Sequence, residues 1–329
     1  MKSPFDSSRS ISAIGEKNLI ARICGRFGST MPPYPFGAGD DCAVIKRNVF
    51  AENVFATSDA VILGVHFTPE TSAFDAAAKL VKRNLSDLAA MGAKPCCALT
   101  SAILSKNLSL DWLDEFCDGL AFAAKKYSLK LVGGDVAAVD KDFFSMHLAL
   151  LGDSEFPPLL RRGAQDGDVL YVTGPLGFSF ESGRHLTFEP RLAEGEFLAR
   201  MNAARVGFVS ACTDLSDGLA SDILNILSEG GASEIDEAAV PRNSFGGESA
   251  DIRRALCDGE DYELLFALRA SEAELRDFER AYFEQFGRKP FRIGIVAKKA
   301  PSEKSALILV SNGSRRPFNG SGYDHYFFS

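Results

Sequence analysis

The sequence predicts an α/β or α+β protein that is built from two domains. Segments with strand-like and helix-like apolar spacing alternate along the whole chain of 329 residues. The stretch "DSEFPPLLRRGAQDGD" interrupts this alternation with polar and turn-forming residues. Because a chain of this length is expected to hold two domains or one large one, we place a boundary near residue 152 and predict domains at 1–152 and 153–329.

The first domain is predicted to open with an amphipathic helix, "GEKNLIARICGRF", which places Leu19, Ile23 and Phe27 on one face. A loop rich in proline and glycine follows, and "NVFATSDAVILGVHF" then predicts a strand, an acidic break and a second strand. Ser72 and Asp75 form a capping pair for the next helix. The remaining elements are a strand "CCALTSAIL", a helix "SLDWLDEFCDGLAFAAKKY", a strand "LKLVGGD" that ends in a turn, and a strand "FFSMHLALLG".

The second domain mixes strands and helices in the same way. Its predicted strands are "VLYVTG", "YELLFAL", "FRIGIV" and "ALILV", and its predicted helices lie near 193–209, 217–229 and 271–286. No fixed-period repeat and no low-complexity tract is present. The pattern therefore predicts two mixed α/β domains and no repeat architecture.

Composition excludes several classes of protein. The formal net charge of -8 argues against non-specific binding to nucleic acid or to anionic membranes. No apolar run is long enough to span a bilayer, and the first residues have no continuous apolar core, so we expect neither a membrane protein nor a signal peptide. The 7 cysteines form no zinc-type pairs, which favours reduced thiols in the cytoplasm.

Aspartates recur at the ends of apolar elements, next to small residues. They are Asp40 and Asp41 after Gly39, Asp59 in "FATSDA", Asp87 in "NLSDLAAMGA", Asp135 after Gly133 and Gly134, and Asp214 with Asp217. Each alone is explained as a turn or a solvated residue. Carboxylates gathered in one place repel each other unless a cation compensates them, and oxygen-only ligation suits Mg²⁺. Thr57, Ser58 and Ser216 add hydroxyl groups beside these acids.

The segment "CTDLSDGLASDIL" leaves two interpretations open. Leu219, Ile223 and Ile226 recur at helical spacing, so a helix is expected from about residue 217. Asp214 or Asp217 then caps the helix start, because Asp accepts hydrogen bonds from the unpaired N–H groups there. One cap explains only one of the two acids, however, and the second favours a metal site.

Carboxylate-bound Mg²⁺ usually holds phosphate as well, yet the common nucleotide signatures are missing. The chain has no G-x-x-x-x-G-K-[ST] motif and no complete G-x-G-x-x-G motif. "GGD" and "TGPLG" are glycine turns whose backbone N–H groups are able to bind phosphate. Arg161 and Arg162 are either a phosphate clamp or a solvated basic pair.

Taken in order, these motifs resemble the thiamine-monophosphate kinase family, whose superfamily includes aminoimidazole ribonucleotide synthetase, selenophosphate synthetase and a hydrogenase-maturation enzyme. The matching segments are "GEKNLIARI", "GAGDDCAVI", "TSDAVILGVHF", "KLVKRNLSDLAAMGAKP", "LVGGD", "GDVLYVTGPLG", "TDLSDGLASDI", "GEDYELLF" and "GYDHYF". They cover nearly the whole chain. The resemblance implies a two-domain ATP-binding synthetase/kinase fold of the aminoimidazole ribonucleotide synthetase type, with mixed sheets and flanking helices.

The resemblance also implies an activity and a set of site residues. The activity is transfer of the γ-phosphoryl group of ATP to thiamine monophosphate, giving thiamine diphosphate, with several Mg²⁺ ions. The implied metal residues are Asp41, Thr57, Ser58, Asp59, Asp87, Asp135, Asp214 and Asp217. Gly134, Asp135, Arg161 and Ser216 match nucleotide contacts, and His66, Glu260 and Tyr323 match contacts with the acceptor. Asp87, Asp135 and Arg161 are the implied catalytic residues.

The same resemblance implies what each domain contributes to the site. The domain at 1–152 carries most of the acids and the strands that join a homodimer, and the domain at 153–329 completes the ATP and substrate site. The acceptor phosphate is already largely ionised at neutral pH, so no general base is expected. Catalysis is then mostly positioning and electrostatics.

Three departures from the family pattern affect residues near the acceptor. Leu63 stands where the family usually has Glu, Val136 follows "GGD" where Thr is usual, and "CDGED" replaces the usual small residues. Two alternatives stay open at this point: another ATP-using enzyme of the superfamily, similar to aminoimidazole ribonucleotide synthetase, or a non-catalytic nucleotide- or metal-binding protein. Release of ADP that depends on thiamine monophosphate separates them.

Overall fold

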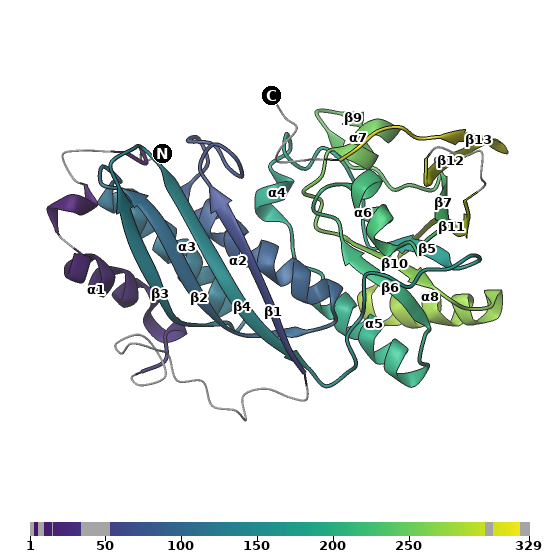
Figure 1. Ribbon diagram of the computed structural model, residues 1–329, viewed down its shortest axis with the longest axis horizontal. Helices are drawn as coiled ribbons and strands as arrows, with labels where there is room; N and C mark the ends of the chain where they lie inside the picture. The colour runs from purple at the N-terminus through teal and green to yellow at the C-terminus, as the bar shows by residue number, and fades with distance from the viewer. Residues whose placement is uncertain (1–2, 6–9, 15, 34–52, 300–304, 323–329) are drawn as a thin grey trace. The chain divides into compact units, whose positions relative to one another are not determined.

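The computed structural model describes residues 3–5, 10–14, 16–33, 53–299 and 305–322. Its contacts divide the chain into two units, which Figure 1 shows in ribbon form. Unit 1 consists of Met1–Leu88 and Lys94–Glu155, and unit 2 consists of Ala89–Ala93 and Phe156–Ser329. The sequence placed a boundary near residue 152, but it did not predict that the short segment Ala89–Ala93 groups with unit 2.

Unit 1 is a mixed four-stranded sheet with helices. Its elements are η2 (Ile11–Ala13), α1 (Glu16–Phe27), η3 (Gly28–Thr30), β1 (Asn53–Ile62), α2 (Ala73–Ala90), β2 (Lys94–Ser105), α3 (Leu110–Lys126), β3 (Lys130–Val139) and β4 (Phe144–Ser154). The strand order is β1-β4-β2-β3. β4 runs antiparallel to both of its neighbours, and β2 and β3 are parallel. β1 and β3 are therefore the two edges of this sheet.

The two faces of this sheet differ. On one face, Phe144 of β4 packs in an aromatic cluster with Trp112 and Phe116 of α3, and α2 and α3 lie behind the sheet in Figure 1. The alternate residues of β2, including Leu99 and Ile103, point to the other face and are exposed. The sheet thus has a covered face and an open face.

Unit 2 is a seven-stranded sheet whose strands β5 and β10 are buried on both faces. Its strands are β5 (Val169–Val172), β6 (Val209–Asp214), β7 (Gly231–Asp236), β10 (Leu264–Leu268), β11 (Phe291–Lys298), β12 (Leu307–Ser311) and β13 (Ser314–Pro317), in the order β13-β12-β7-β11-β5-β10-β6. Its helices are α4 (Arg184–Thr187), α5 (Leu192–Ala204), α6 (Leu219–Ile226), α7 (Ile252–Cys257) and α8 (Glu272–Phe286), and β8 (Ser244–Phe245) pairs with β9 (Glu248–Ser249).

Alternation along β5 explains why this sheet needs helices on both sides. Leu170 and Val172 belong to a core cluster with residues of α6 and α7. Val169 and Tyr171 belong to a second cluster with residues of α5 and α8. The prediction of mixed sheets with flanking helices is confirmed for both units.

Several predicted elements match closely because their signals are local. The Ser72 hydroxyl accepts from Asp75 N at 3.0 Å, so the predicted cap of α2 is present. α8 begins with a complete capping box at Ser271 and Glu274 and ends at Gly287 in the left-handed conformation. Strong terminal signals of this kind made these helix bounds predictable.

Three predictions of local structure were wrong. β1 runs without a break from Asn53 to Ile62, so Asp59 lies inside a strand and does not end one. β3 runs from Lys130 to Val139 straight through Gly133, Gly134 and Asp135, where a turn was expected. The predicted helix near 193–209 ends at Ala204, and β6 begins at Val209. Hydrogen bonds to neighbouring strands overrode the local preference in β1 and β3.

Within the part of the chain that the structure describes, no helix is both long and apolar enough to cross a membrane.

Candidate active site

In unit 1, β1 and α2 bring three of the predicted metal residues together. Thr57 and Asp59 alternate with Ser58 along β1, so they share the face that meets α2. The Thr57 hydroxyl donates to a carboxylate oxygen of Asp87 on α2. Asp59 N donates to Asn84 Oδ1 at 3.0 Å, which fixes the strand against the same helix. Ser58 is exposed on the opposite face of the sheet, so only its backbone lies near this group.

Asp59 also has a cationic neighbour. Arg83 NH2 lies 3.6 Å from Asp59 Oδ1, and Arg83 NH1 donates to Ala60 O at 2.6 Å. The carboxylate keeps about a third of its surface exposed, at 31%. Asp59 is therefore partly compensated by Arg83 and still open to a ligand.

Asp135, the third predicted metal-binding acid in the described part of unit 1, lies away from this group. Asp135 is exposed on β3, whereas Thr57 and Asp59 are on β1, and β4 and β2 lie between these edges. Three strand spacings correspond to about 14 Å. The structure therefore does not bring Asp135 to the group on β1 and α2. Asp41, the remaining predicted ligand, lies outside the described residues.

Gly134 is required by a close approach of two strands. A Cβ atom at this position would lie 2.2 Å from Thr100 O on β2. A side chain would therefore force β3 away from β2. The "GGD" motif thus serves strand packing as well as any ligand contact.

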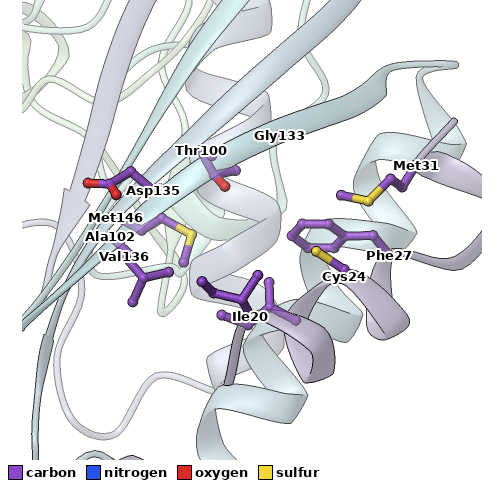
Figure 2. A pocket seen from close by; sticks show the side chains of 12 residues that line it. Ile20, Cys24, Phe27, Met31, Thr100, Ala102, Gly133, Asp135, Val136 and Met146 are labelled. Carbon is purple, nitrogen blue, oxygen red and sulfur yellow. The ribbon is translucent and has the colours of Figure 1, made fainter. Parts of the chain in front are cut away.

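A pocket opens beside this motif, between α1 and the sheet. Figure 2 shows Ile20, Cys24 and Phe27 of α1 facing Thr100, Ala102 and Val136 of the strands, with the Asp135 carboxylate pointing away from α1. The full lining is Ile20, Ile23, Cys24, Phe27, Met31, Thr100, Ala102, Gly133, Gly134, Asp135, Val136 and Met146. The sequence did not predict this pocket, because it depends on how α1 packs on distant strands.

His66 is buried, with 7% of its surface exposed. Its Nδ1 accepts from Ile62 N at 3.1 Å, so the ring carries its proton on Nε2 when it is neutral. Its carbonyl accepts from the buried ammonium of Lys79 at 2.7 Å. Any contact of the His66 ring with a phosphoryl-acceptor substrate must therefore be made through its Nε2 side.

In unit 2, the segment after β6 carries the other predicted acids. Asp214 is the last residue of β6 and is 3% exposed. α6 begins at Leu219 with Gly218 at its N-cap position, where no side chain is available to cap it. Asp222 instead accepts from Asp217 N at 3.0 Å and from Gly218 N at 3.1 Å. The capping interpretation of this motif thus applies to Asp222, which the sequence analysis missed.

The electrostatics of this segment indicate a deficit of positive charge. Burial and the nearby carboxylates of Asp214 and Asp217 raise the pKa of Asp222 to about 8. Arg161 acts in the opposite direction on the same carboxyl group. Arg161 follows Leu160, whose carbonyl accepts from Cys212 N of β6 at 2.8 Å, so the chain holds this arginine beside the acids.

Two loops of unit 2 interlock through glycines. Glu260 N donates to Ser216 O at 2.7 Å, and Tyr262 N donates to Leu215 O at 2.8 Å. A Cβ atom on Gly218 would lie 2.9 Å from Leu256 O, and one on Gly259 would lie 3.0 Å from Ser216 O. The "DLSDG" and "GEDYE" motifs therefore hold each other in place, although more than 40 residues separate them in the sequence.

The "GEDYE" loop also contacts a histidine that the sequence analysis missed. His185 Nδ1 lies 3.1 Å from Glu260 Oε2, and the His185 ring stacks on Phe180 with ring centroids 4.3 Å apart. Tyr323, the other predicted acceptor contact in this part of the chain, lies outside the described residues. No local pattern links residues 180–185 to Glu260, so only the tertiary structure reveals the contact.

The side chains in each unit fit Mg²⁺ by their chemistry. The donors are carboxylate and hydroxyl oxygens, which are the ligands that Mg²⁺ prefers. In unit 2 burial raises the pKa of Asp222, and the nearby carboxylates of Asp214 and Asp217 add repulsion that a divalent cation would relieve. Among the described residues, no three His, Cys, Asp or Glu side chains already stand as a complete metal site. The fit therefore rests on donor type and charge in each unit separately.

The comparisons with known proteins identify the class first. Residues 39–152 match the model of the AIR synthase related protein, N-terminal domain. The thiamine-monophosphate kinase of Salmonella typhimurium is 33% identical over 342 residues, which cover 95% of this chain and 99% of that protein. The crystal structure of thiamine-monophosphate kinase from Stenotrophomonas maltophilia is 30% identical, with a TM-score of 0.67, and the match covers 87% of this chain and 95% of that one.

A further solved structure is described as AaThiL complexed with AMPPCP and TMP. It is 24% identical, has a TM-score of 0.63, and matches 96% of this chain and 98% of its own. The fold and the domain match thus define a protein of the AIR synthase related class. The chain belongs to the thiamine-monophosphate kinase family and is an enzyme of the phosphotransferase class. The family resemblance that the motifs indicated is confirmed.

Proposed function

We propose that this enzyme transfers the γ-phosphoryl group of ATP to thiamine monophosphate, giving thiamine diphosphate, by direct in-line transfer with several Mg²⁺ ions. The observation that carries the proposal is the match of 33% identity over 95% of the chain to a thiamine-monophosphate kinase. The similar structure that contains AMPPCP and TMP supports the choice of the two substrates.

Each unit contributes its own oxygen ligands in this proposal. The metal residues of unit 1 are Asp41, Thr57, Ser58, Asp59, Asp87 and Asp135, and those of unit 2 are Asp214 and Asp217. The contact of Thr57 with Asp87 supports a shared role for β1 and α2. Bound Mg²⁺ would neutralise phosphate charge and align the two polyanions.

The nucleotide contacts are Gly134, Asp135, Arg161 and Ser216. The pocket between α1 and β3 adjoins Gly134 and Asp135, and its lining is largely apolar, as a purine base requires. Arg161 carries a positive charge beside the acids of unit 2. Its task is to bind phosphate oxygens and to balance charge as the phosphoryl group moves.

The acceptor contacts are His66, Glu260 and Tyr323. The acceptor phosphate is a monoester that is largely ionised at neutral pH, so these residues need not remove a proton from it. Their work is to orient the acceptor so that its phosphate oxygen faces the γ-phosphorus. His66, held by the Ile62 N–H and unable to rotate freely, suits such an orienting role.

The proposal includes a homodimer joined through unit 1. Asp59 and Asp135 lie on opposite edges of one sheet, about 14 Å apart by strand spacing, which is too far for two ligands of one Mg²⁺ ion. The open face of that sheet also carries Val54, Leu99 and Ile103, which are 56%, 43% and 36% exposed. A second copy would cover these apolar residues and bring its own Asp135 to the first copy.

We also place the enzyme in the cytoplasm. The described cysteines are free, and burial raises the pKa of Cys97 on β2, which suits reduced thiols with no redox role.

The decisive experiment is release of ADP from ATP and Mg²⁺, with and without thiamine monophosphate. The proposal expects ADP and thiamine diphosphate in equal amounts, and little ADP when the acceptor is left out. ADP release that ignores the acceptor would indicate another superfamily reaction. No release under any condition would indicate a protein that binds nucleotide without catalysis.

A further inference from the structure

The segment between β5 and α5, at residues 175–188, is bound tightly to the "GEDYE" loop. Gly177 N and the Ser179 hydroxyl both donate to Asp261 Oδ1, at 2.9 and 2.6 Å. Phe178 N donates to Asp258 Oδ2 at 3.0 Å. Asp261 is 1% exposed, so its bonds are made in a dry environment where they are strongest. The segment is thus held in one position relative to the loop.

Arg184 fastens the same two segments from the other side. Its NH2 donates to Pro175 O at 3.0 Å and to Asp261 O at 2.9 Å. Glu263, which lies beside Arg184, is 1% exposed. Its carboxylate accepts two hydrogen bonds from Arg191, at 2.7 and 2.6 Å, and one from the Thr173 hydroxyl at 2.6 Å. This buried network makes residues 175–188 a fixed wall beside the loop.

The loop itself is held in a strained conformation. Glu260 and Tyr262 have positive φ values of 53° and 51°, which L-residues rarely adopt. Tyr262 is 2% exposed and stacks on Phe188, with ring centroids 4.0 Å apart. Strain of this kind persists only where the surroundings determine the conformation, and it is concentrated at ligand-binding sites.

The wall presents two side chains to Glu260. His185 is 4% exposed, and its Nδ1 lies 3.1 Å from Glu260 Oε2. Phe180 lies flat against the His185 ring, with 16° between the ring planes, and is 47% exposed. A carboxylate, the histidine that holds it and a half-exposed aromatic ring therefore stand side by side on one rigid base.

We propose that Phe180 and His185, together with Glu260, recognise the heterocyclic end of the acceptor. Phe180 stacks on a planar ring of the ligand, and His185 is a positioning residue that fixes the Glu260 carboxylate. This inference rests on the proposed function, because that function supplies an acceptor with a cationic thiazolium ring and an aminopyrimidine ring.

The chemistry of the three side chains matches such a ligand. An aromatic face attracts a flat cation, and the attraction grows where water is excluded. His185 Nδ1 lies within hydrogen-bond distance of Glu260 Oε2 and fixes this carboxylate, which carries a negative charge. That charge then faces the cationic or amino-bearing ring. The Glu260 carboxylate repels a phosphate group, so this surface favours the heterocycle over the phosphate.

The test compares full-length variants in thiamine diphosphate formation and in calorimetric titration with thiamine, which lacks phosphate. Phe180→Leu should raise the KM for thiamine monophosphate about fivefold to tenfold and that for ATP less than about twofold. His185→Leu should have a similar effect, whereas His185→Asn should restore most of it, because its amide nitrogen replaces Nδ1. Phe283→Leu is the matched control, since Phe283 on α8 is 52% exposed.

The outcomes separate the two proposals. If the wild type forms no thiamine diphosphate, the proposed function fails, and the titration still tests the surface. If the wild type is active and Phe180→Leu keeps both KM values, the inference is wrong. Equal thiamine affinity for wild type and Phe180→Leu, or no affinity in either, also overturns it. A variant that lowers only kcat, or only the melting temperature, would assign Phe180 and His185 a purely structural role.

Discussion

Unit 1 and unit 2 hold their candidate site residues in different ways. In unit 1 the acids lie within regular elements, as Asp59 does in β1 and Asp87 in α2. In unit 2 they lie at the end of a strand and on loops, as Asp214 and Glu260 do. Strands and helices fix the first group by backbone hydrogen bonding, whereas the second group depends on interlocked glycines and a buried ionic network.

This difference teaches where each unit's group of residues is vulnerable. A loop can hold a precise geometry only when its polar groups are satisfied elsewhere, and Glu263 with Arg191 does this for unit 2. In unit 1 the same precision follows from the sheet register. We therefore expect changes remote from ligands to harm unit 2 most, and changes of ligand residues to harm activity in both units.

The largest effect should come from breaking the buried network of unit 2. Glu263→Ala removes a buried carboxylate and leaves the partly buried Arg191 with only the more distant Glu194, so it should cost about 3–5 kcal/mol of unfolding free energy. Thermal or urea unfolding measures this loss. Glu272→Ala is the control, because its pair with Arg292 is exposed, and it should leave the melting temperature nearly unchanged. Equal stability for both variants would contradict the importance of the network.

Removing the charge of Asp87 should abolish most activity without unfolding unit 1. Asp87→Asn still accepts the Thr57 hydrogen bond, so the melting temperature should hold, while kcat should fall by about 100-fold or more as electrostatic stabilisation is lost. Asp75→Asn changes another acid of α2 and should retain normal turnover. The measurement is thiamine diphosphate formation at saturating ATP, acceptor and Mg²⁺, and near-normal turnover of Asp87→Asn would rule out its metal role.

In unit 2, Asp217→Asn separates ligand binding from capping. Because α6 begins after Asp217, the apo melting temperature should change little. The additional stabilisation by ATP and Mg²⁺ should shrink, since ligand stabilisation follows affinity. Asp251→Asn is the control, because Asp251 does cap α7 by accepting from Arg254 N at 2.8 Å and Asn caps nearly as well. A mutant that melts lower but gains as much from Mg²⁺-ATP would restore the capping interpretation.

The smallest effect should appear at His66. His66→Asn keeps an acceptor for the Ile62 N–H but removes the ring beyond it, so the fold should persist. The KM for thiamine monophosphate should rise by about tenfold, as the loss of one neutral hydrogen bond predicts, and the KM for ATP should stay nearly constant. If the ATP value moves instead, His66 belongs with the nucleotide contacts.

Much of the fold was predictable because its signals are local. The helices α2, α3 and α8 have amphipathic faces and recognisable caps, and the bounds of α3 and α8 match the predictions within one residue. The errors occurred where a local signal for a break or a turn conflicted with pairing to a neighbouring strand. Asp59 indicated a break, but β1 pairs with β4 along its whole length. Gly133 and Gly134 indicated a turn, but Gly134 is needed for the approach of β3 to Thr100.

By itself, the sequence determined the class of the protein and the chemistry available to it. The order of its motifs identified the family, and the repeated aspartates with neighbouring hydroxyls predicted an oxygen-only donor set. These features are visible because motif order and residue type do not depend on folding.

The tertiary structure decided which of those residues meet. It placed Asp135 on the far edge from Asp59, gave the capping role near Gly218 to Asp222, and brought His185 to Glu260. These contacts join residues from distant segments, and their geometry depends on packing that no local pattern records. A side chain's partner is set by the whole core, whereas its chemical type is set by one position in the chain.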